Sequence, residues 1–323
     1  MQVLIADVGG TNTRLQLYEI TQNYIEVVFS EKYSSQNYSD LALIIRTFFD
    51  KHRVKQTPQM ACIAAAGPVS GGCVKLTNLP WEINAAQLGV SLGIADISLI
   101  NDVEAAAYAV DDEHVNSGIL LQEGRAVSSG ASVVVNIGTG FGQALRVNNG
   151  GVIQVMASEG GHVDFAPVND NDLALFRFLS KELNRVSVES VLSGPGLVRI
   201  YRYLNSQQSG KADEMLNSID IVRKAGEGEA QAINALRYFF ELLAGHLGNI
   251  ILTYLPVRGI YIMGSVLPAM VGYFPQQKFI TALADRGAFS ELIKSKLIKI
   301  LTQDDLGLAG ASKLAQLRLK SLK

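Results

Sequence analysis

Residues 3–18 read VLIADVGGTNTRLQLY. The apolar run at 3–6 predicts a short buried strand that ends at Asp7, and the alternating side chains of 13–18 predict a strand that returns beside it. Between the two strands lies the turn Gly9-Gly10-Thr11-Asn12. A further strand at 25–29 extends the pattern to a meander of three strands.

The same arrangement begins again in the middle of the chain. Residues 132–137 form a strongly apolar run, the turn Gly138-Thr139-Gly140-Phe141-Gly142 follows, and 143–147 returns as a strand. The two halves share this form and not their residue identities, so the repeat is weak. At 323 residues the chain is also too long for one small domain, and two packed lobes are expected.

Strands and helices alternate along the rest of the chain, which indicates an α/β protein. Further strands are expected at 60–66, 97–100 and 259–263, and helices at 38–51, 103–110, 173–183, 230–255 and 306–317. No segment rich in proline or serine separates the halves, so we expect a close hinge and not a flexible linker.

Composition narrows the function classes. Hydrophobic residues make up 48% and charged residues 18%, which predicts an ordered core. The 28 basic and 30 acidic residues leave a net charge of −2, so nothing favours a nucleic-acid or anionic-membrane partner. Two cysteines, no secretion signal and no apolar run of about 20 residues predict a reduced, cytoplasmic protein.

The two glycine-rich turns suit phosphate groups, because glycines let backbone amides approach phosphate oxygens. Asp7 is placed to hold Mg²⁺ through water, and Thr11 to donate to a phosphate. The alternative is a pair of plain hairpin turns whose glycines supply positive φ angles. The phosphate loop GxxxxGK[ST] does not occur in the sequence.

Asn101 and Asp102 follow the strand 97–100 and precede the helix 103–110. Ligands bind at this edge of open α/β sheets. A carboxylate at this point can accept the proton of an attacking hydroxyl group, as phosphoryl transfer requires, and Asn101 can bind a neighbouring hydroxyl. The alternative is helix capping, which both residue types favour.

The segment 158–167, SEGGHVDFAP, is the most specific in the chain. Its paired glycines disfavour a helix, so Glu159 and His162 are expected on a tight loop, where a carboxylate and an imidazole can grip two vicinal hydroxyls. A metal site is the alternative, but a second cluster of ligands is missing. Gly264-Ser265 ends the strand 259–263, where a flat base can stack on the backbone; a plain turn explains it equally well.

Taken together, these segments resemble the bacterial glucokinase family, the proteobacterial branch of the actin-like sugar kinases, nearly from end to end. The residues that carry the resemblance are 7–12, 76–78 with Trp81, 100–102, 138–142, 159–167 and 191–197. The resemblance implies an α/β, two-lobed, actin-like (ribonuclease H-like) fold with the active site in a cleft between the lobes. The small domain would comprise 1–110 completed by a C-terminal helix within 304–323, and the large domain 111–303.

The resemblance also implies the reaction: transfer of the γ-phosphoryl group of ATP to the 6-hydroxyl of glucose, the first step of glycolysis, with Asp102 as general base. The positions that match the sugar ligands of the family are Asn101, Asp102, Glu159, His162 and Glu189. Those that match its nucleotide site are Asp7, Gly9, Gly10, Thr11, Asn12, Gly138, Thr139, Gly140, Gly264 and Ser265. Mg²⁺ and a homodimer are implied as well.

Two residues depart from the pattern of the family. Ser265 stands where a second glycine is usual in the segment that meets adenosine, which bears on ATP affinity and donor preference. Ser158 replaces a glycine beside a sugar ligand, where a small residue is retained and little effect is expected. Two alternatives stay open: a kinase for another hexose or an amino sugar, and a sugar-binding regulator without catalysis.

Overall fold

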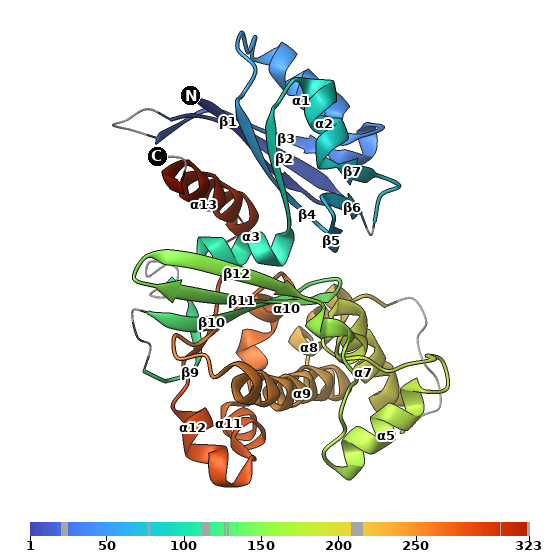
Figure 1. Ribbon diagram of the computed structural model, residues 1–323. Coiled ribbons are helices and arrows are strands. Elements are labelled where there is room, and N and C mark those ends of the chain that lie inside the picture. The colour runs from blue at the N-terminus through green and yellow to red at the C-terminus, as the bar shows by residue number, and fades with distance from the viewer. Residues whose placement is uncertain are drawn as a thin grey trace. The chain divides into compact units, whose positions relative to one another are not determined.

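The computed structural model describes residues 1–20, 25–76, 78–110, 117–125, 127, 129–207, 216–303 and 305–321 (Figure 1). Contacts group the chain into two compact units. Unit 1 comprises Met1–Asp111 with Asp304–Lys323, and unit 2 comprises Asp112–Gln303. Thr77 of the motif 76–78, and residues 111 and 304 at the expected domain boundaries, lie outside the described residues. The α/β class predicted from the sequence is confirmed.

Unit 1 is built on a five-stranded sheet in the order β3-β2-β1-β4-β8. The strands are β1 (Gln2–Val8), β2 (Asn12–Ile20), β3 (Ile25–Ser34), β4 (Met60–Ala65) and β8 (Asp96–Asn101). The first three form the expected antiparallel meander, whereas β4 runs parallel to β1 and β8 parallel to β4. A small sheet of β5 (Val69–Ser70), β6 (Cys73–Lys75) and β7 (Glu82–Asn84) accompanies it.

Strand β1 is apolar from Val3 to Ala6 because both of its faces are covered. Leu4, Ala6 and Val8 pack with helix α1 (Leu41–Lys51). Val3 and Ile5 pack with helices α3 (Asp102–Ala109) and α13 (Leu306–Ser321) on the opposite face (Figure 1). Helix α2 (Ala85–Leu92) lies beside α1. The C-terminal helix therefore completes the core that the N-terminal strand begins.

Caps set two helix boundaries that the apolar spacing misplaces. Helix α1 begins at Leu41 and not at 38, because the Asp40 carboxylate accepts a hydrogen bond from the Leu43 amide at 2.8 Å. Helix α5 (Asp170–Leu179) begins three residues before the expected 173, because Asn169 caps it through the Asp172 amide at 2.9 Å. In both cases a short polar side chain satisfies an amide that the helix itself leaves unpaired.

Unit 2 repeats the strand pattern in a six-stranded sheet of the order β12-β11-β10-β13-β14-β9. Strands β10 (Gly130–Ile137), β11 (Phe141–Asn149) and β12 (Val152–Ser158) form an antiparallel meander, and β13 (Ile260–Met263) and β14 (Ile298–Ile300) follow in parallel. Strand β9 (Ile119–Gln122) closes the edge. The first five strands thus match the sheet of unit 1 in order and direction, which confirms the repeat of form.

The core of unit 2 surrounds the long helix α9 (Ala230–Tyr254), which packs against the sheet (Figure 1). The shorter helices are α6 (Val188–Val191), α7 (Gly194–Ser206), α8 (Ser218–Gly226), α10 (Val266–Met270), α11 (Gln276–Ala284) and α12 (Ser290–Lys294). Within the described ranges, no helix has the length and apolar character that spanning a membrane requires.

Candidate active site

The first glycine-rich turn, between β1 and β2, is fixed by a short network. The Gly9 amide donates to the Asn12 carbonyl at 2.9 Å. Ser35 holds the turn from the other side: its hydroxyl donates to the Gly9 carbonyl at 2.8 Å and its amide to the Thr11 carbonyl at 2.9 Å. The turn is therefore anchored through its own carbonyl oxygens, and its side chains are small.

The glycines of this turn are needed for space and not for conformation. Neither Gly9 nor Gly10 has a positive φ angle, so the explanation as a plain hairpin with left-handed glycines is wrong. A Cβ on Gly10 would lie 2.7 Å from the Cβ of Asn78, from the motif 76–78. Backbone without side chains is what a phosphate group needs in order to approach amide hydrogens.

Asp7, at the end of β1, carries a carboxylate in an unfavourable setting. Burial raises the pKa of this carboxyl to about 6; the nearby Arg14 guanidinium opposes the shift, and the Asp102 carboxylate adds to it. Helix α13 closes over the group, because a Cβ on Gly307 would lie 2.9 Å from the Asp7 Cγ. A buried carboxylate with another acid nearby gains from a bound cation.

Asn101 and Asp102 divide two tasks at the junction of β8 and α3. Asn101 is the cap of α3, and its Oδ1 accepts from the Glu104 amide at 2.5 Å. Asp102 is the first residue of the helix, and its Oδ1 accepts from the adjacent Val103 amide at 3.0 Å. The capping alternative is thus correct for Asn101, which is the N-cap, and Asp102 also places one carboxylate oxygen on an amide of the first turn. Since β1, β4 and β8 run parallel, Asp7 and Asp102 lie at the same edge of the sheet.

The second glycine-rich turn, in unit 2, is held by the segment that runs from α6 to α7. The Gly138 amide donates to the Gly140 carbonyl at 3.0 Å, and the Gly194 amide donates to the Gly138 carbonyl at 2.8 Å. The Phe141 amide donates to the Glu189 Oε2 at 2.8 Å. Gly138 and Gly140 also lack positive φ angles, and a Cβ on Gly140 would lie 2.6 Å from the same carboxylate oxygen.

Within the expected loop, Glu159 directly precedes the 3-10 turn η2 (Gly160–His162), and His162 is the last residue of that turn. Their Oε2 and Nε2 atoms are 3.9 Å apart, and 60% and 62% of the two side chains are exposed. The two glycines between them are buried against β11. A side chain at Gly160 would overlap with the Gln143 amide group, and one at Gly161 would overlap with the Phe141 carbonyl. The turn therefore presents two polar groups on a tightly packed backbone.

Ser158 takes part in fixing this turn. Its hydroxyl accepts from the Gly160 amide and donates to the Gln143 carbonyl, both at 3.3 Å. The structure adds no support for a metal site at this loop. The part of the chain that it describes contains no group of three or more His, Cys, Asp or Glu side chains placed to hold a metal ion. Vicinal hydroxyl groups remain the better match for a carboxylate and an imidazole.

A pocket of about 660 Å³ within unit 2 adjoins the second glycine-rich turn. Of the predicted nucleotide residues, Gly138, Thr139 and Ser265 line it, together with Gly194, Pro195, Val198, Arg199, Leu216, Asn217, Ser218, Ile219, Val222, Val266 and Ala269. Gly264 is not among the lining residues. With φ at +112° and no room beside the Ile137 carbonyl, it is the glycine that β13 needs to end there.

The wall that α8 contributes to this pocket was missed from the sequence. Ile219, which is 77% exposed, lies in the first turn of α8, where Asn217 and Asp220 form a reciprocal cap. Asn217 followed three residues later by an acid is a helix-start signal that indicates this element. The spacing of α8 does not indicate that it borders a glycine-rich turn.

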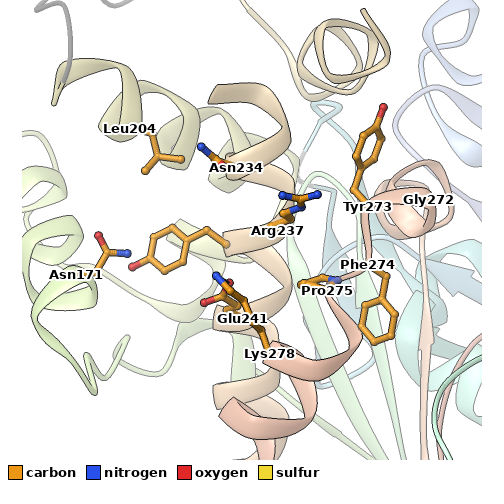
Figure 2. A pocket seen from close by; sticks show the side chains of 11 residues that line it. Asn171, Leu204, Asn234, Arg237, Glu241, Gly272, Tyr273, Phe274, Pro275 and Lys278 are labelled. Atoms are coloured by element: carbon orange, nitrogen blue, oxygen red, sulfur yellow. Dashed lines mark hydrogen bonds and ion pairs between the residues drawn. The ribbon is translucent and has the colours of Figure 1, made fainter. Parts of the chain in front are cut away.

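A second pocket of unit 2, of about 490 Å³, contains none of the predicted residues (Figure 2). It is lined by residues of α5, α7, α9 and α11 and by the 3-10 turn that ends at Tyr273. Its Glu241 and Lys278 side chains are joined in an ion pair at 3.1 Å. The pocket at the glycine-rich turn is therefore the better candidate for a ligand of the predicted site.

Comparisons with known proteins agree with these features. A family model described as Glucokinase matches residues 4–318. A glucokinase of Nostoc sp. is 32% identical over 96% of this chain and 97% of its own length, and one of Tolumonas auensis is 33% identical over 99% and 98%. The crystal structure of a glucokinase from an Antarctic psychrotroph covers 98% of both chains, at 30% identity and a TM-score of 0.83.

Proposed function

Since the chain belongs to the glucokinase family, whose members are ATP-dependent sugar kinases, we propose that Asp102 is the general base of its phosphoryl transfer to glucose. One observation supports this role above the others. Asn101, and not Asp102, is the N-cap of α3, and the Asp102 carboxylate stands one residue further on, where its Oδ1 accepts from the adjacent Val103 amide. It stands at the sheet edge where α/β proteins bind ligands.

The proposed step is a single displacement. The glucose 6-oxygen forms a bond to the γ-phosphorus as the bond from that phosphorus to the ADP oxygen breaks, and Asp102 accepts the proton of the 6-hydroxyl. With its Oδ1 engaged in the cap, Asn101 retains an NH₂ group that donates to a sugar hydroxyl. Glu159, His162 and Glu189 hold further hydroxyls, and this requirement rejects compounds that lack them.

We assign ATP to the pocket at the second glycine-rich turn. Its walls of Leu216, Ile219, Val222 and Val266 suit a flat base, and the backbone at Gly138 and Thr139 suits phosphates. Ser265 lines the pocket with φ at −82°, an ordinary angle for serine, so its Cβ causes no backbone strain. The turn at Gly9, Gly10, Thr11 and Asn12 is assigned to phosphate oxygens as well.

These residues suit a Mg²⁺ ion that is shared with the phosphate groups of the nucleotide, and not one that is held by protein groups alone. Mg²⁺ in kinases is commonly held by one or two carboxylates together with phosphate oxygens and water. Asp7, whose carboxyl has a raised pKa because burial disfavours its charge, is the residue that would hold it. When bound, the ion neutralises charge on the phosphate oxygens.

We further propose that units 1 and 2 are the small and large lobes of an actin-like kinase with the site in the cleft between them. The matching order and direction of five strands in the two sheets support this proposal. The family resemblance supports a homodimer in the cytoplasm with glucose and ATP as its small-molecule ligands.

The test is an ADP-release assay with glucose and Mg-ATP, on the wild type and on Asp102→Asn. We expect turnover in the wild type and a loss of about 10²- to 10⁴-fold in the variant, the usual contribution of a general base. Glu104→Gln, which neutralises the other acid in the first turn of α3, is the matched control and should stay active. Asp102→Asn turnover within tenfold of wild type would remove Asp102 from this role.

The same assay separates the alternatives. A panel of hexoses and amino sugars crossed with several phosphoryl donors should give the highest kcat/KM for glucose with ATP. Preference for another sugar would reassign the substrate. Glucose binding without ADP release under any donor would instead identify a sugar-binding regulator.

A further inference from the structure

The backbone of Phe141 is a junction between the two sugar-side segments of unit 2 and the second glycine-rich turn. Phe141 directly follows Gly138-Thr139-Gly140, and its amide donates to the Glu189 Oε2 at 2.8 Å. Its carbonyl lies against Gly161, between Glu159 and His162. The residues proposed to bind glucose therefore rest on the residue that ends the proposed phosphate turn.

The segment from Glu189 to Gly194 holds this turn at both ends. Glu189 binds the amide that follows the turn, and the Gly194 amide donates to the Gly138 carbonyl at its start, at 2.8 Å. Ser193 makes the segment itself rigid: its hydroxyl donates to the Glu189 carbonyl at 2.8 Å and accepts from the Gly196 amide at 3.0 Å. Movement of the Glu189 carboxylate is thus transmitted to the turn through few bonds.

The contact is also sterically tight. A Cβ on Gly140 would lie 2.6 Å from the Glu189 Oε2, so the turn and the carboxylate fit only without a side chain at 140. The Phe141 ring is buried and packs edge-on against His246 with ring centroids 5.1 Å apart, which fixes the position of residue 141 in the core. The Glu189 Oε2 accepts the hydrogen bond from the Phe141 amide, so Oε1 is the oxygen that we assign to a sugar hydroxyl.

We propose that Glu189 couples the two ligands: a sugar bound to its Oε1 holds Oε2 on the Phe141 amide, and this fixes the glycine turn in the form that binds nucleotide. The inference rests on the proposed function and adds to it a route of communication within unit 2. Because coupling between ligands is reciprocal, nucleotide must strengthen glucose binding by the same factor. Glu189 is in this respect a positioning residue for the nucleotide as well as a sugar ligand.

The experiment is isothermal titration calorimetry, in which a non-hydrolysable ATP analogue, together with Mg²⁺, is titrated into the protein. One titration is made without glucose and one at saturating glucose. The ratio of the two dissociation constants is the coupling factor. We expect at least about fivefold tightening in the wild type, the lower end of typical coupling. Glu189→Ala should reduce the factor to about 1, because the Phe141 amide loses its acceptor. Glu189→Gln keeps a carbonyl oxygen for that amide and should retain most of the factor.

Glu159→Ala is the matched control, because it removes a proposed sugar ligand of the same charge that makes no bond to the turn. It should weaken glucose binding and leave the coupling factor unchanged. Should Glu189→Ala fail to fold, Gly140→Ala tests the same contact by displacing the carboxylate, and it should also lose coupling.

Equal coupling factors in Glu189→Ala and Glu159→Ala would overturn the proposal, since Glu189 would then act only as a sugar ligand. Full coupling in a folded Gly140→Ala would do the same. A wild type that does not bind glucose at all would overturn the proposed function and the coupling with it, and this outcome is visible before any variant is made.

Discussion

Asp7 carries its carboxylate in a setting that disfavours the charged form. Its folded-state pKa of about 6 lies above the usual 3.8, so the folded protein favours the protonated form. The corresponding stabilisation is fully present below about pH 4 and is lost as the pH rises through 6. Near neutral pH the metal-free protein therefore carries a charged carboxylate in a site that disfavours it.

Asp7→Asn should consequently stabilise the metal-free protein while it abolishes turnover. In EDTA at pH 7.5 the melting temperature should rise, and the free energy of unfolding should increase by at most about 3 kcal/mol. This increase should become smaller towards pH 5. Differential scanning calorimetry across this pH range measures it. Glu82→Gln, at an exposed acid of the same unit, should show no such trend. A melting temperature that is unchanged or lower at pH 7.5 would contradict the prediction.

For single residues, the sequence predicts which positions belong to the candidate site better than it predicts why each residue type is needed there. The position of Asp102 after a strand follows from the local pattern, and so does the pairing of Glu159 with His162. The glycines of both turns were attributable to positive φ angles, whereas the structure requires Gly10 and Gly140 for packing and leaves open space beside Gly138. Gly10 faces Asn78 and Gly140 faces Glu189, and neither neighbour is near in the sequence. Glu189 alone would be taken for a solvated helix residue, since only the fold brings it to Phe141.

Among the elements, helix α13 combines two close packings that a sequence pattern does not reveal. Gly310 lies so close to α3 that a side chain there would overlap with the Ala105 carbonyl. Gly307, one turn earlier, faces the Asp7 carboxylate instead. Both glycines lower the intrinsic stability of the helix relative to alanine, by about 1 kcal/mol each. Each glycine leaves room for the group that lies opposite it, the Ala105 carbonyl at Gly310 and the Asp7 carboxylate at Gly307.

The two glycines should therefore respond differently to alanine. Gly310→Ala forces α13 away from the backbone of α3, and we expect a loss of about 1–3 kcal/mol in the free energy of unfolding. Gly307→Ala displaces only the Asp7 side chain and gains helix propensity, so its melting temperature should stay within a few degrees of wild type. Its turnover should fall and its requirement for Mg²⁺ should rise.

Thermal melts and Mg²⁺ titrations of turnover on both variants test this pair. Full turnover of Gly307→Ala at every Mg²⁺ concentration would show that the contact with Asp7 is not functional. A Gly310→Ala variant as stable as wild type would show that the two helices separate without cost.

Elements with strong apolar periodicity were predictable, and weakly patterned ones were not. The spacing of α9, and the apolar runs of β1 and β10, reflect burial that the chain encodes locally. Strand β12 is an edge strand with exposed Val152 and Met156, so burial does not impose a pattern on it. The starts of α1 and α5 depend on caps at Asp40 and Asn169, and the apolar spacing does not report these.

For the molecule as a whole, the main departure from two sequential halves is the C-terminal segment. Unit 2 is continuous in sequence, whereas unit 1 needs residues from both ends of the chain. Leu308, Ala311 and Ala315 of α13 are buried in one cluster with Val3 and Ile5 of β1. Unit 1 can therefore complete its core only after α13 has been synthesised.

Removal of α13 should unfold unit 1 selectively. Truncation after Gln303 exposes one face of the sheet, and burial of each large apolar side chain contributes about 1.5–3 kcal/mol against a net stability of about 5–15 kcal/mol. We expect protease to degrade 1–110 rapidly while 117–303 persists, because the core of unit 2 surrounds α9 and includes no residue of α13. Limited proteolysis with mass spectrometry measures this. Truncation after Leu319, beyond the last buried alanine, should leave both units resistant. Equal resistance of both units after truncation at Gln303 would mean that unit 1 folds without its C-terminal helix, and the sheet itself would then have to carry its stability.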